Sequence, residues 1–264
     1  MLNTIRAIAV KHYNGDTRRG PRHEYIIKQL RKRGCKPYVD QYQNIWVEKG
    51  SGKKLILFSS HIDVDPHIHN TSFKSRKSGS TRIIRGVLDD AAGCYINLLL
   101  AQEGPRNGRA IYVFTASEEV DKKNHARFAR SAQEVVRQLK TKGVIPDLCV
   151  AIDVTYPRFK RYRKRLDWGK QHNELFDMSD TMHCYLDGYS DRRSKKIGAA
   201  FVKRFKSANV KIREFYGHDE AHVYSRISPA FAFGPVVYGR FDRPKQEMPL
   251  VHVKTALRFL RKIR

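Results

Sequence analysis

Short apolar segments that alternate with longer amphipathic ones restrict the fold of this chain most strongly. The short segments are rich in β-branched and apolar residues, whereas the longer ones repeat apolar residues at helical spacing. The expected strands are Asn44–Val47, Leu55–Ser59, Ile83–Val87, Ala110–Thr115, Leu148–Asp153, Val210–Phe215 and Ala230–Phe233. The expected helices are an amphipathic N-terminal helix, Arg22–Arg33, Ala91–Gln102, His125–Leu139, Arg192–Ser207 and Leu250–Ile263. This alternation predicts a three-layer α/β/α fold with a central, mostly parallel mixed sheet.

Two segments depart from the alternation. Pro66–Ser80 is polar and basic and is expected to be an exposed loop, while Pro157–Asp180 is basic and aromatic with little periodicity. Both follow candidate site residues, so we expect loops that contact substrate. The length of 264 residues and the absence of an internal repeat lead us to expect a single catalytic domain over residues 1–264.

The charge of the chain is strongly positive. Lys and Arg number 52 against 26 Asp and Glu, which gives a formal charge of +26. Such a chain attracts nucleic acid, an anionic surface or an acidic substrate, or it comes from a basic proteome. The cations concentrate locally at Arg158–Arg165 and Arg258–Arg264, but neither zinc-finger spacing nor the signature of an RNA-recognition sheet accompanies them. Nucleic acid therefore stays open as a partner.

The four cysteines are far apart and form no CxxC pair. Cys94 and Cys149 lie in apolar runs, which indicates buried, reduced thiols and a cytoplasmic protein. We expect no contact with a membrane, since no apolar stretch is long enough to span a bilayer and the first residues lack a signal-peptide cleavage pattern.

Three of the expected strands end in residues that bind metals or move protons. His61 and Asp63 follow the run LILFSS, Glu118 and Glu119 follow AIYVFTAS, and Asp153 follows DLCVAI. In an open α/β sheet, ligands lie beyond the carboxyl ends of the strands, so these side chains can converge.

Each motif alone has an ordinary structural explanation. A His-x-Asp caps a turn, paired glutamates begin a helix, and Asp89-Asp90 supplies an N-cap. Their joint occurrence at three strand ends and one helix start favours a common site. One imidazole with several carboxylates suits Zn²⁺, Mn²⁺ or Co²⁺, and a single Asp can bridge two metal ions.

The series HIDVD, GVLDDAAGC, TASEEV and AIDVT resembles the co-catalytic zinc exopeptidases. That superfamily contains leucyl-type aminopeptidases, tetrahedral archaeal aminopeptidases and carboxypeptidase G-like enzymes. The later segment YGHDEAHVYSR, followed by AFAFGP, resembles the family's Gly-x-Asp-Ala stretch. The resemblance runs from about Arg22 to the C-terminus.

The resemblance implies two divalent metal ions, zinc first and manganese or cobalt as alternatives. By that resemblance His61 and Asp153 bind one ion, Glu119 binds the other, and Asp89 bridges them. Asp63 would orient the ring of His61, a role that metal-bound histidines generally need filled.

Two further residues receive roles away from the metals. Glu118 would be the general base that takes a proton from the attacking water and delivers it to the leaving amine. His218 would contact substrate at the edge of the pocket. His218 and His222 also have the i, i+4 spacing of a metal pair on a helix, which is the less favoured alternative.

The last ligand departs from the family pattern. The family places a His in a His-Ser/Thr-Pro motif before the final helix, and that position falls on Asp242 in FDRP. His252 falls beside the apolar stripe of the final helix and is expected on its surface. We therefore predict Asp242 as the last ligand.

The spacing of the motifs narrows the function. Only a short basic segment separates His61 from Asp89, which leaves no room for an assembly domain, and the chain after Asp153 is too short for a lid domain. We therefore expect an aminopeptidase that removes terminal residues from peptides, acidic ones included. A carboxypeptidase or an N-acyl-amino-acid deacylase on the same fold is one alternative. A degenerate relative that binds nucleic acid or an anionic partner is another.

Overall fold

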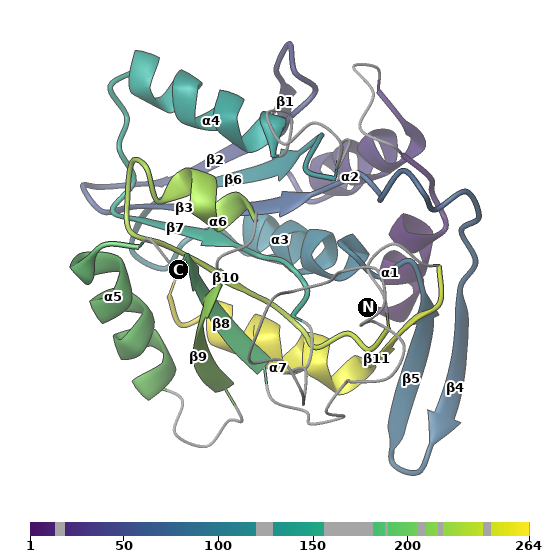
Figure 1. Ribbon diagram of the computed structural model, residues 1–264. Helices are drawn as coiled ribbons and strands as arrows, with labels where there is room; N and C mark the ends of the chain where they lie inside the picture. Colours follow the sequence, from purple (N-terminus) through teal and green to yellow (C-terminus); the bar gives the residue numbers. More distant parts are fainter. Residues whose placement is uncertain are drawn as a thin grey trace.

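The computed structural model describes residues 1–13, 19–119, 129–155, 182–187, 190–204, 210–215, 219–239 and 244–263 (Figure 1). Its elements, in chain order, are α1 (Leu2–Ala9), α2 (Pro21–Lys32), β1 (Tyr38–Val39), β2 (Ile45–Ser51), β3 (Leu55–His61), β4 (Lys74–Ser78), β5 (Thr81–Gly86), α3 (Ala91–Glu103), β6 (Gly108–Thr115), α4 (Arg130–Thr141), β7 (Leu148–Ala151), β8 (Met182–Asp187), α5 (Arg192–Lys203), β9 (Val210–Phe215), α6 (Glu220–Tyr224), β10 (Ala230–Phe233), β11 (Gln246–Pro249) and α7 (Leu250–Leu260).

The central sheet has the strand order β1-β2-β6-β3-β7-β10-β8-β9 in the described part of the chain. The four middle strands, β6, β3, β7 and β10, are parallel to one another. Antiparallel pairs flank them, since β2 pairs with β6 and β8 with β10 in that sense. The predicted mostly parallel mixed sheet is therefore confirmed.

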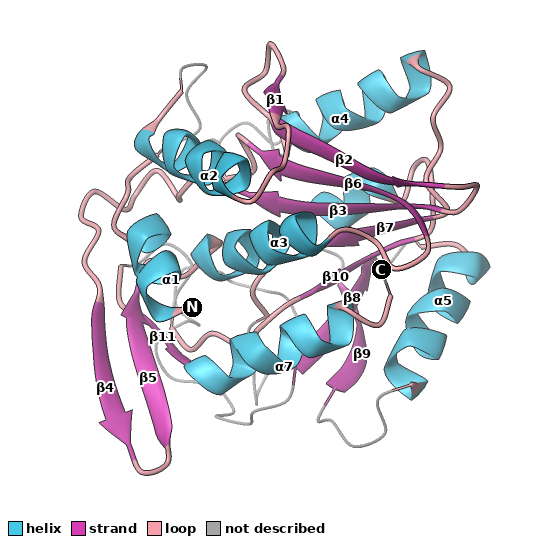
Figure 2. Ribbon diagram, turned by 180° about the vertical axis from the view of Figure 1, so that it is seen from behind, coloured by secondary structure: helices cyan, strands magenta, loops and turns pink. Residues whose placement is uncertain are grey.

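Both faces of this sheet are apolar because its side chains alternate between two cores. Along β3, Ile56 and Phe58 enter the core beneath α1, α2, α3 and α7, while Leu55 and Leu57 enter the core beneath α4 and α6. Figures 1 and 2 show these helix groups on opposite faces of the sheet. Helix α3 lies between the sheet and other helices, which explains why its sequence, AAGCYINLLLAQE, is apolar on nearly all sides. The predicted three-layer arrangement is confirmed.

A second sheet differs from the sequence prediction. Strands β11, β5 and β4 form a three-stranded antiparallel sheet beside α1. The predicted strand Ile83–Val87 thus belongs to this sheet and not to the central one. The prediction of a loop over Pro66–Ser80 was wrong at Lys74–Ser78, which is β4. All five side chains of β4 are exposed, so its sequence lacks the apolar alternation that signals a strand.

Two other predicted segments lie partly or wholly outside the described residues. The helix expected over His125–Leu139 begins at Arg130 where it is described, and Pro157–Asp180 lies wholly outside the described residues. Cys94 and Cys149 are buried and free, as expected, and so are Cys35 and Cys184. Among the described helices, none is both long and apolar enough to cross a membrane.

Candidate metal centre

The parallel middle of the sheet brings the predicted site residues together. His61 is the last residue of β3, which lies between β6 and β7. Glu118 follows β6 by three residues and Asp153 follows β7 by two. Because parallel strands end at one edge, residues that are distant in sequence meet beyond the end of β3.

His61 lies at the middle of the cluster. Its ring is buried, and Nε2 lies 3.0 Å from Asp89 Oδ1, 3.2 Å from Glu118 Oε2 and 3.8 Å from Asp153 Oδ1. Within the described residues, two overlapping groups have ligand atoms within 4.8 Å of one another, namely His61 with Glu118 and Asp153, and His61 with Asp89 and Glu119. Glu118, expected to be a base, thus stands as close to the imidazole as the expected ligands.

Asp63 connects the ring of His61 to the end of β6. Its Oδ1 lies 3.3 Å from His61 Nδ1, and its Oδ2 accepts hydrogen bonds from the backbone N–H groups of Glu118 (2.9 Å) and Glu119 (2.8 Å). The side chain is completely buried. One carboxylate therefore fixes both the imidazole and the segment that carries the two glutamates.

The start of α3 holds Asp89 in place. Asp90 is the N-cap, and its Oδ1 accepts a hydrogen bond from Gly93 N at 2.8 Å. A Cβ on Gly93 would lie 2.4 Å from the backbone oxygen of Ile152 and 2.3 Å from both oxygens of Asp90, so glycine is required there. The buried amide oxygen of Gln246 on β11 accepts hydrogen bonds from Leu88 N (2.6 Å) and Asp89 N (2.9 Å).

Burial and mutual repulsion raise the pKa values of the clustered acids well above their ordinary values. Burial is the largest cause for Glu118, and the negative charge of Asp153 raises the pKa of Glu118 further. Burial is also the largest cause for Glu119 and Asp153, and the charge of Asp89 raises the pKa of both. Burial alone would lower the pKa of His61. The charge of Glu118 and hydrogen bonds to the neighbouring aspartates instead raise that pKa well above its ordinary value.

Arg22, which the sequence analysis did not single out, lies behind the cluster. It is completely buried at the start of α2, where its Nη1 donates to Ile62 O at 2.8 Å and its Nε to Lys11 O at 2.7 Å. Its charge acts on Asp63, Asp89 and Asp90. The guanidinium thus holds the chain just after β3 and offsets part of the negative charge. Its position inside a predicted helix gave no sign of this role.

Glu220 is a second buried acid that the sequence analysis missed. It lies on α6, and one carboxylate oxygen accepts a short hydrogen bond from Ser59 Oγ on β3. Its other oxygen, Oε1, has no hydrogen-bond partner among the described residues. Burial raises the pKa of Glu220 to about 7 although hydrogen bonds from Ser59 and Thr115 oppose the shift.

The remaining predicted residues lie apart from the cluster or cannot be placed. His222 is on α6 and its Nδ1 lies 2.9 Å from Asp187 Oδ1, so this imidazole pairs with an acid of β8. His218 and Asp242 lie outside the described residues. His252 is within the final helix as expected, but its prediction as a surface residue was wrong, because only 4% of it is exposed and it contacts Val236.

The cluster has the chemistry of a divalent-metal site. In the described part of the chain, acid oxygens outnumber the positive groups found near them, which are His61 and Arg22. Two buried oxygens, Glu118 Oε2 and Asp90 Oδ2, have no hydrogen-bond partner among the described residues. Buried charges need a partner, and a metal ion bound by an imidazole and carboxylates provides one. The residues present therefore fit a divalent cation.

Comparisons with known proteins agree with the fold. No protein-family profile matches the sequence, and no curated protein matches it either. Among solved structures, the TET1 peptidase of Pyrococcus horikoshii has a TM-score of 0.73 at 12% identity, over 99% of this chain and 98% of that chain. An aminopeptidase from the archaeon Desulfurococcus kamchatkensis has a TM-score of 0.72 at 12% identity, over 99% and 93%. A Thermotoga maritima protein described as an endoglucanase has a TM-score of 0.62 at 15% identity, over 97% and 95%. The resemblance expected from the motifs is confirmed at the level of the fold.

Proposed function

We propose that this chain is a metal-dependent hydrolase of the aminopeptidase type, which releases residues from the ends of peptides. The observation that carries the proposal is the convergence of one imidazole and several acids at the carboxyl edge of β6, β3 and β7. Two divalent cations, zinc first and manganese or cobalt as alternatives, supply polarisation of the scissile carbonyl and a lowered pKa of water when bound. The fold shared with the aminopeptidases above supports this choice of reaction.

The side chains divide into ligands and groups that act on them. The proposed ligands are His61 and Asp153 for one cation, Glu119 for the other, Asp89 between the two, and Asp242 in the last position. Asp63 keeps the ring of His61 in one orientation through the contact at 3.3 Å.

Glu118 is the proposed general base. Its Oε2 has no hydrogen-bond partner among the described residues and lies 3.2 Å from His61 Nε2, a proposed ligand atom, which supports a role beside the metal-bound water. It takes that proton from the attacking water and passes it to the leaving amine of the peptide. His218, outside the described residues, is proposed to contact the substrate.

A substrate panel tests the proposal. Metal-loaded protein is offered peptides with free and with acetylated N-termini, N-acyl amino acids, peptides read out for C-terminal release, and a soluble cellulose. We expect release of the N-terminal residue from free peptides alone, and Glu118→Gln purified in parallel controls for contaminating peptidases. Cleavage of N-acyl amino acids or of the C-terminal bond would assign one of the alternative hydrolases, and activity on cellulose alone would refute a peptidase.

Peptides of acidic, neutral and basic composition are compared within the same panel. The charge of +26 favours acidic peptides at low salt, because the field of the protein concentrates anions near its surface. Equal rates of hydrolysis for all three compositions at low salt would show that the protein has no preference for acidic peptides.

A further inference from the structure

The hairpin of β4 and β5 is rich in positive charge. Residues 74–85, here called the basic ribbon, contain five cationic side chains and no acid, whereas the whole chain has 52 cations in 264 residues. The five are Lys74, Arg76, Lys77, Arg82 and Arg85. In both ribbon views the hairpin projects away from the layers of the central sheet (Figures 1 and 2).

The strand register places these cations on both faces of the ribbon. Lys74 stands opposite Arg85, so both lie on one face together with Arg76, two residues along β4. Lys77 stands opposite Arg82 on the other face. Every side chain of β4 is exposed. The second face is covered at the base of the hairpin, where Ile84 is buried in the core, so a partner can meet positive charge from both sides only toward the tip.

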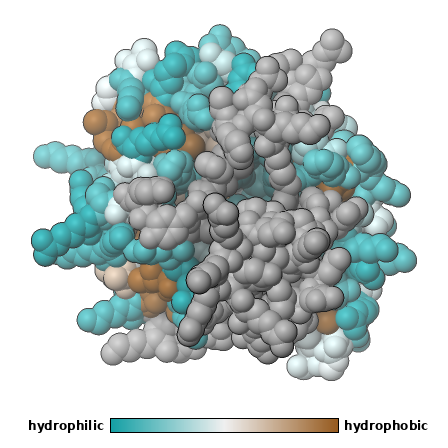
Figure 3. Space-filling view, viewed as in Figure 1, coloured by the Kyte–Doolittle hydropathy of each residue, from teal (hydrophilic) through white to brown (hydrophobic). Residues whose placement is uncertain are grey.

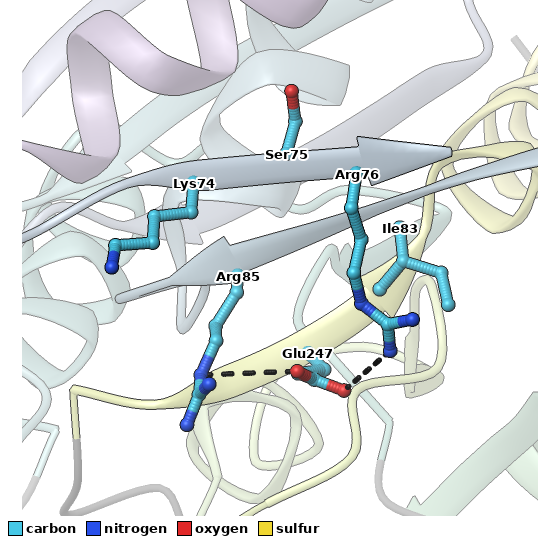
Figure 4. A pocket seen from close by; sticks show the side chains of 6 residues that line it. All are labelled: Lys74, Ser75, Arg76, Ile83, Arg85 and Glu247. Atoms are coloured by element: carbon cyan, nitrogen blue, oxygen red, sulfur yellow. Dashed lines mark ion pairs between the residues drawn. The ribbon is translucent and has the colours of Figure 1, made fainter. Parts of the chain in front are cut away.

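A hollow of about 200 Å³ lies on the first face, lined by Lys74, Ser75, Arg76, Ile83, Arg85 and Glu247. The guanidinium groups of Arg76 and Arg85 approach the carboxylate of Glu247 from two sides, at 3.7 and 3.8 Å (Figure 4). Two cations thus share one acid at distances longer than a hydrogen bond. The hollow keeps a net positive charge and donors suited to a phosphate group.

The distribution of charge indicates a repeating anion. A ligand with one phosphate could use the hollow, but it would leave Lys77 and Arg82 on the other face without a counterion. Residues two apart on a strand are spaced by roughly 6.6 Å, so the cations form a row along the ribbon. Where the surface is described in Figure 3 it is mainly hydrophilic, and the ribbon itself offers only the partly buried Ile83 as an apolar contact. A protein partner would need a larger apolar anchor.

We propose that the basic ribbon binds the phosphate backbone of duplex DNA without sequence preference. Strand β11 pairs with β5 only over residues 83–86, so the hairpin continues as two strands over residues 77–82. The major groove of B-form DNA admits such a two-stranded β-ribbon, whereas that of A-form RNA is too narrow to enter. Residues 74–85 contain no aromatic side chain on which the bases of a single strand could stack. This binding function is independent of the proposed hydrolysis.

Helix α5 provides a matched control within the chain. It also has five cations in twelve residues and no acid, and Arg192, Arg193 and Lys196 are exposed on it. It lies against β8, β9 and β10 and so presents its charge on one side of a helix. The test variant is Lys74→Gln with Arg76→Gln and Lys77→Gln; the control variant is Arg192→Gln with Arg193→Gln and Lys196→Gln. Each removes three charges.

Binding is measured by fluorescence anisotropy with a short labelled DNA duplex between about 50 and 200 mM salt. We expect wild-type affinity to fall steeply with salt, and the ribbon variant to lower the slope of log K against log salt by about 2.7, from roughly 0.9 per lost phosphate contact. Its Kd at the lowest salt should rise at least about tenfold, while the control changes much less. Single-stranded DNA, duplex RNA and polyglutamate of equal charge should bind more weakly than duplex DNA.

Each other outcome overturns the proposal. Equal losses in the two variants would show that total charge, and not the ribbon, attracts DNA. If polyglutamate or single-stranded DNA bound as tightly as duplex DNA, the ribbon would not recognise the groove of a duplex. A second variant, Arg82→Gln with Arg85→Gln, leaves the charges of the edge strand in place. Suppose that the β4 variant aggregates and loses DNA binding while the Arg82/Arg85 variant keeps it. The β4 cations would then serve to prevent strand pairing between molecules, and not to bind DNA. Peptide hydrolysis, measured on the same samples, should be equal in all variants, so this proposal and the proposed function fail separately.

Discussion

Replacement of Asp63 by asparagine is expected to weaken metal binding at His61 while the fold persists. The backbone N–H groups of Glu118 and Glu119 point at Oδ2 and require an acceptor there. The single oxygen of asparagine must therefore take that place, which turns its NH₂ group toward His61 Nδ1 at the present 3.3 Å contact. An NH₂ group donates, so Nδ1 becomes the acceptor and the ring proton moves to Nε2. That nitrogen faces the acids of the site and can no longer bind a cation.

The size of the effect follows from these contacts. Loss of a carboxylate that orients a metal-bound histidine costs about 10- to 100-fold in metal affinity, and the wrong tautomer should place this variant at the upper end or beyond. Stability should change little, by about 1–2 kcal/mol, because both backbone donors keep an acceptor. Asp63→Ala is the contrasting variant. It leaves two buried N–H groups unpaired, at about 1–3 kcal/mol each.

Two measurements separate these effects. Calorimetric titration of metal-free protein with Mn²⁺ or Co²⁺ gives the affinity and the number of sites, and urea unfolding in the presence of a chelator gives the stability. Asp63→Asn should lose affinity with nearly unchanged stability, whereas Asp63→Ala should lose both. An Asp63→Asn protein that binds metal as tightly as the wild type would refute the tautomer argument.

Three further changes have distinct expected outcomes. Glu118→Gln should lower kcat by about two to four orders of magnitude with metals retained, while Glu119→Gln should lower metal content. If the two variants behave identically in metal analysis and steady-state kinetics, the assignment of Glu118 as base and Glu119 as ligand is wrong. Glu220 has a folded-state pKa of about 7 against 4.5 unfolded, so its contribution to stability is complete below pH 4.5 and lost as pH rises to 7. In metal-free protein, Glu220→Gln should reduce this fall in unfolding free energy by up to about 3 kcal/mol. The same dependence of unfolding free energy on pH in variant and wild type would contradict this expectation. Gln246→Leu leaves the two backbone N–H groups before α3 without their acceptor and should cost about 2 kcal/mol or more together with metal affinity, whereas Gln246→Glu keeps the oxygen and should restore most of the affinity.

Features of the fold and the site could be predicted from the sequence where they depend on a local residue pattern or on the parallel arrangement of the strands. His61 could be placed because strands that alternate with helices become parallel neighbours, and their carboxyl ends share an edge. An N-cap could be expected at Asp89-Asp90 from the position of this pair before an apolar run, and the structure has it at Asp90. Both inferences need only a few consecutive residues and a rule of topology.

Residues that reach the site from distant segments could not be found in this way. Gln246 lies 157 positions from Asp89 in a four-residue strand, and nothing in QEMP distinguishes a buried amide from an exposed one. His252 was expected beside an apolar stripe, yet α7 packs against both α3 and β5, so a wider arc of the helix is buried. Strand β4 escaped prediction because pairing with β5, and not burial, defines it.

Stepwise addition of metal to chelator-treated protein, with peptide hydrolysis followed in the same samples, tests the central claim most directly. Metal-free protein should be inactive, and activity should rise with added zinc, manganese or cobalt until two equivalents are bound. His61→Ala should remain inactive at every metal concentration that leaves it folded. Full hydrolysis by protein shown to contain no metal would contradict the account.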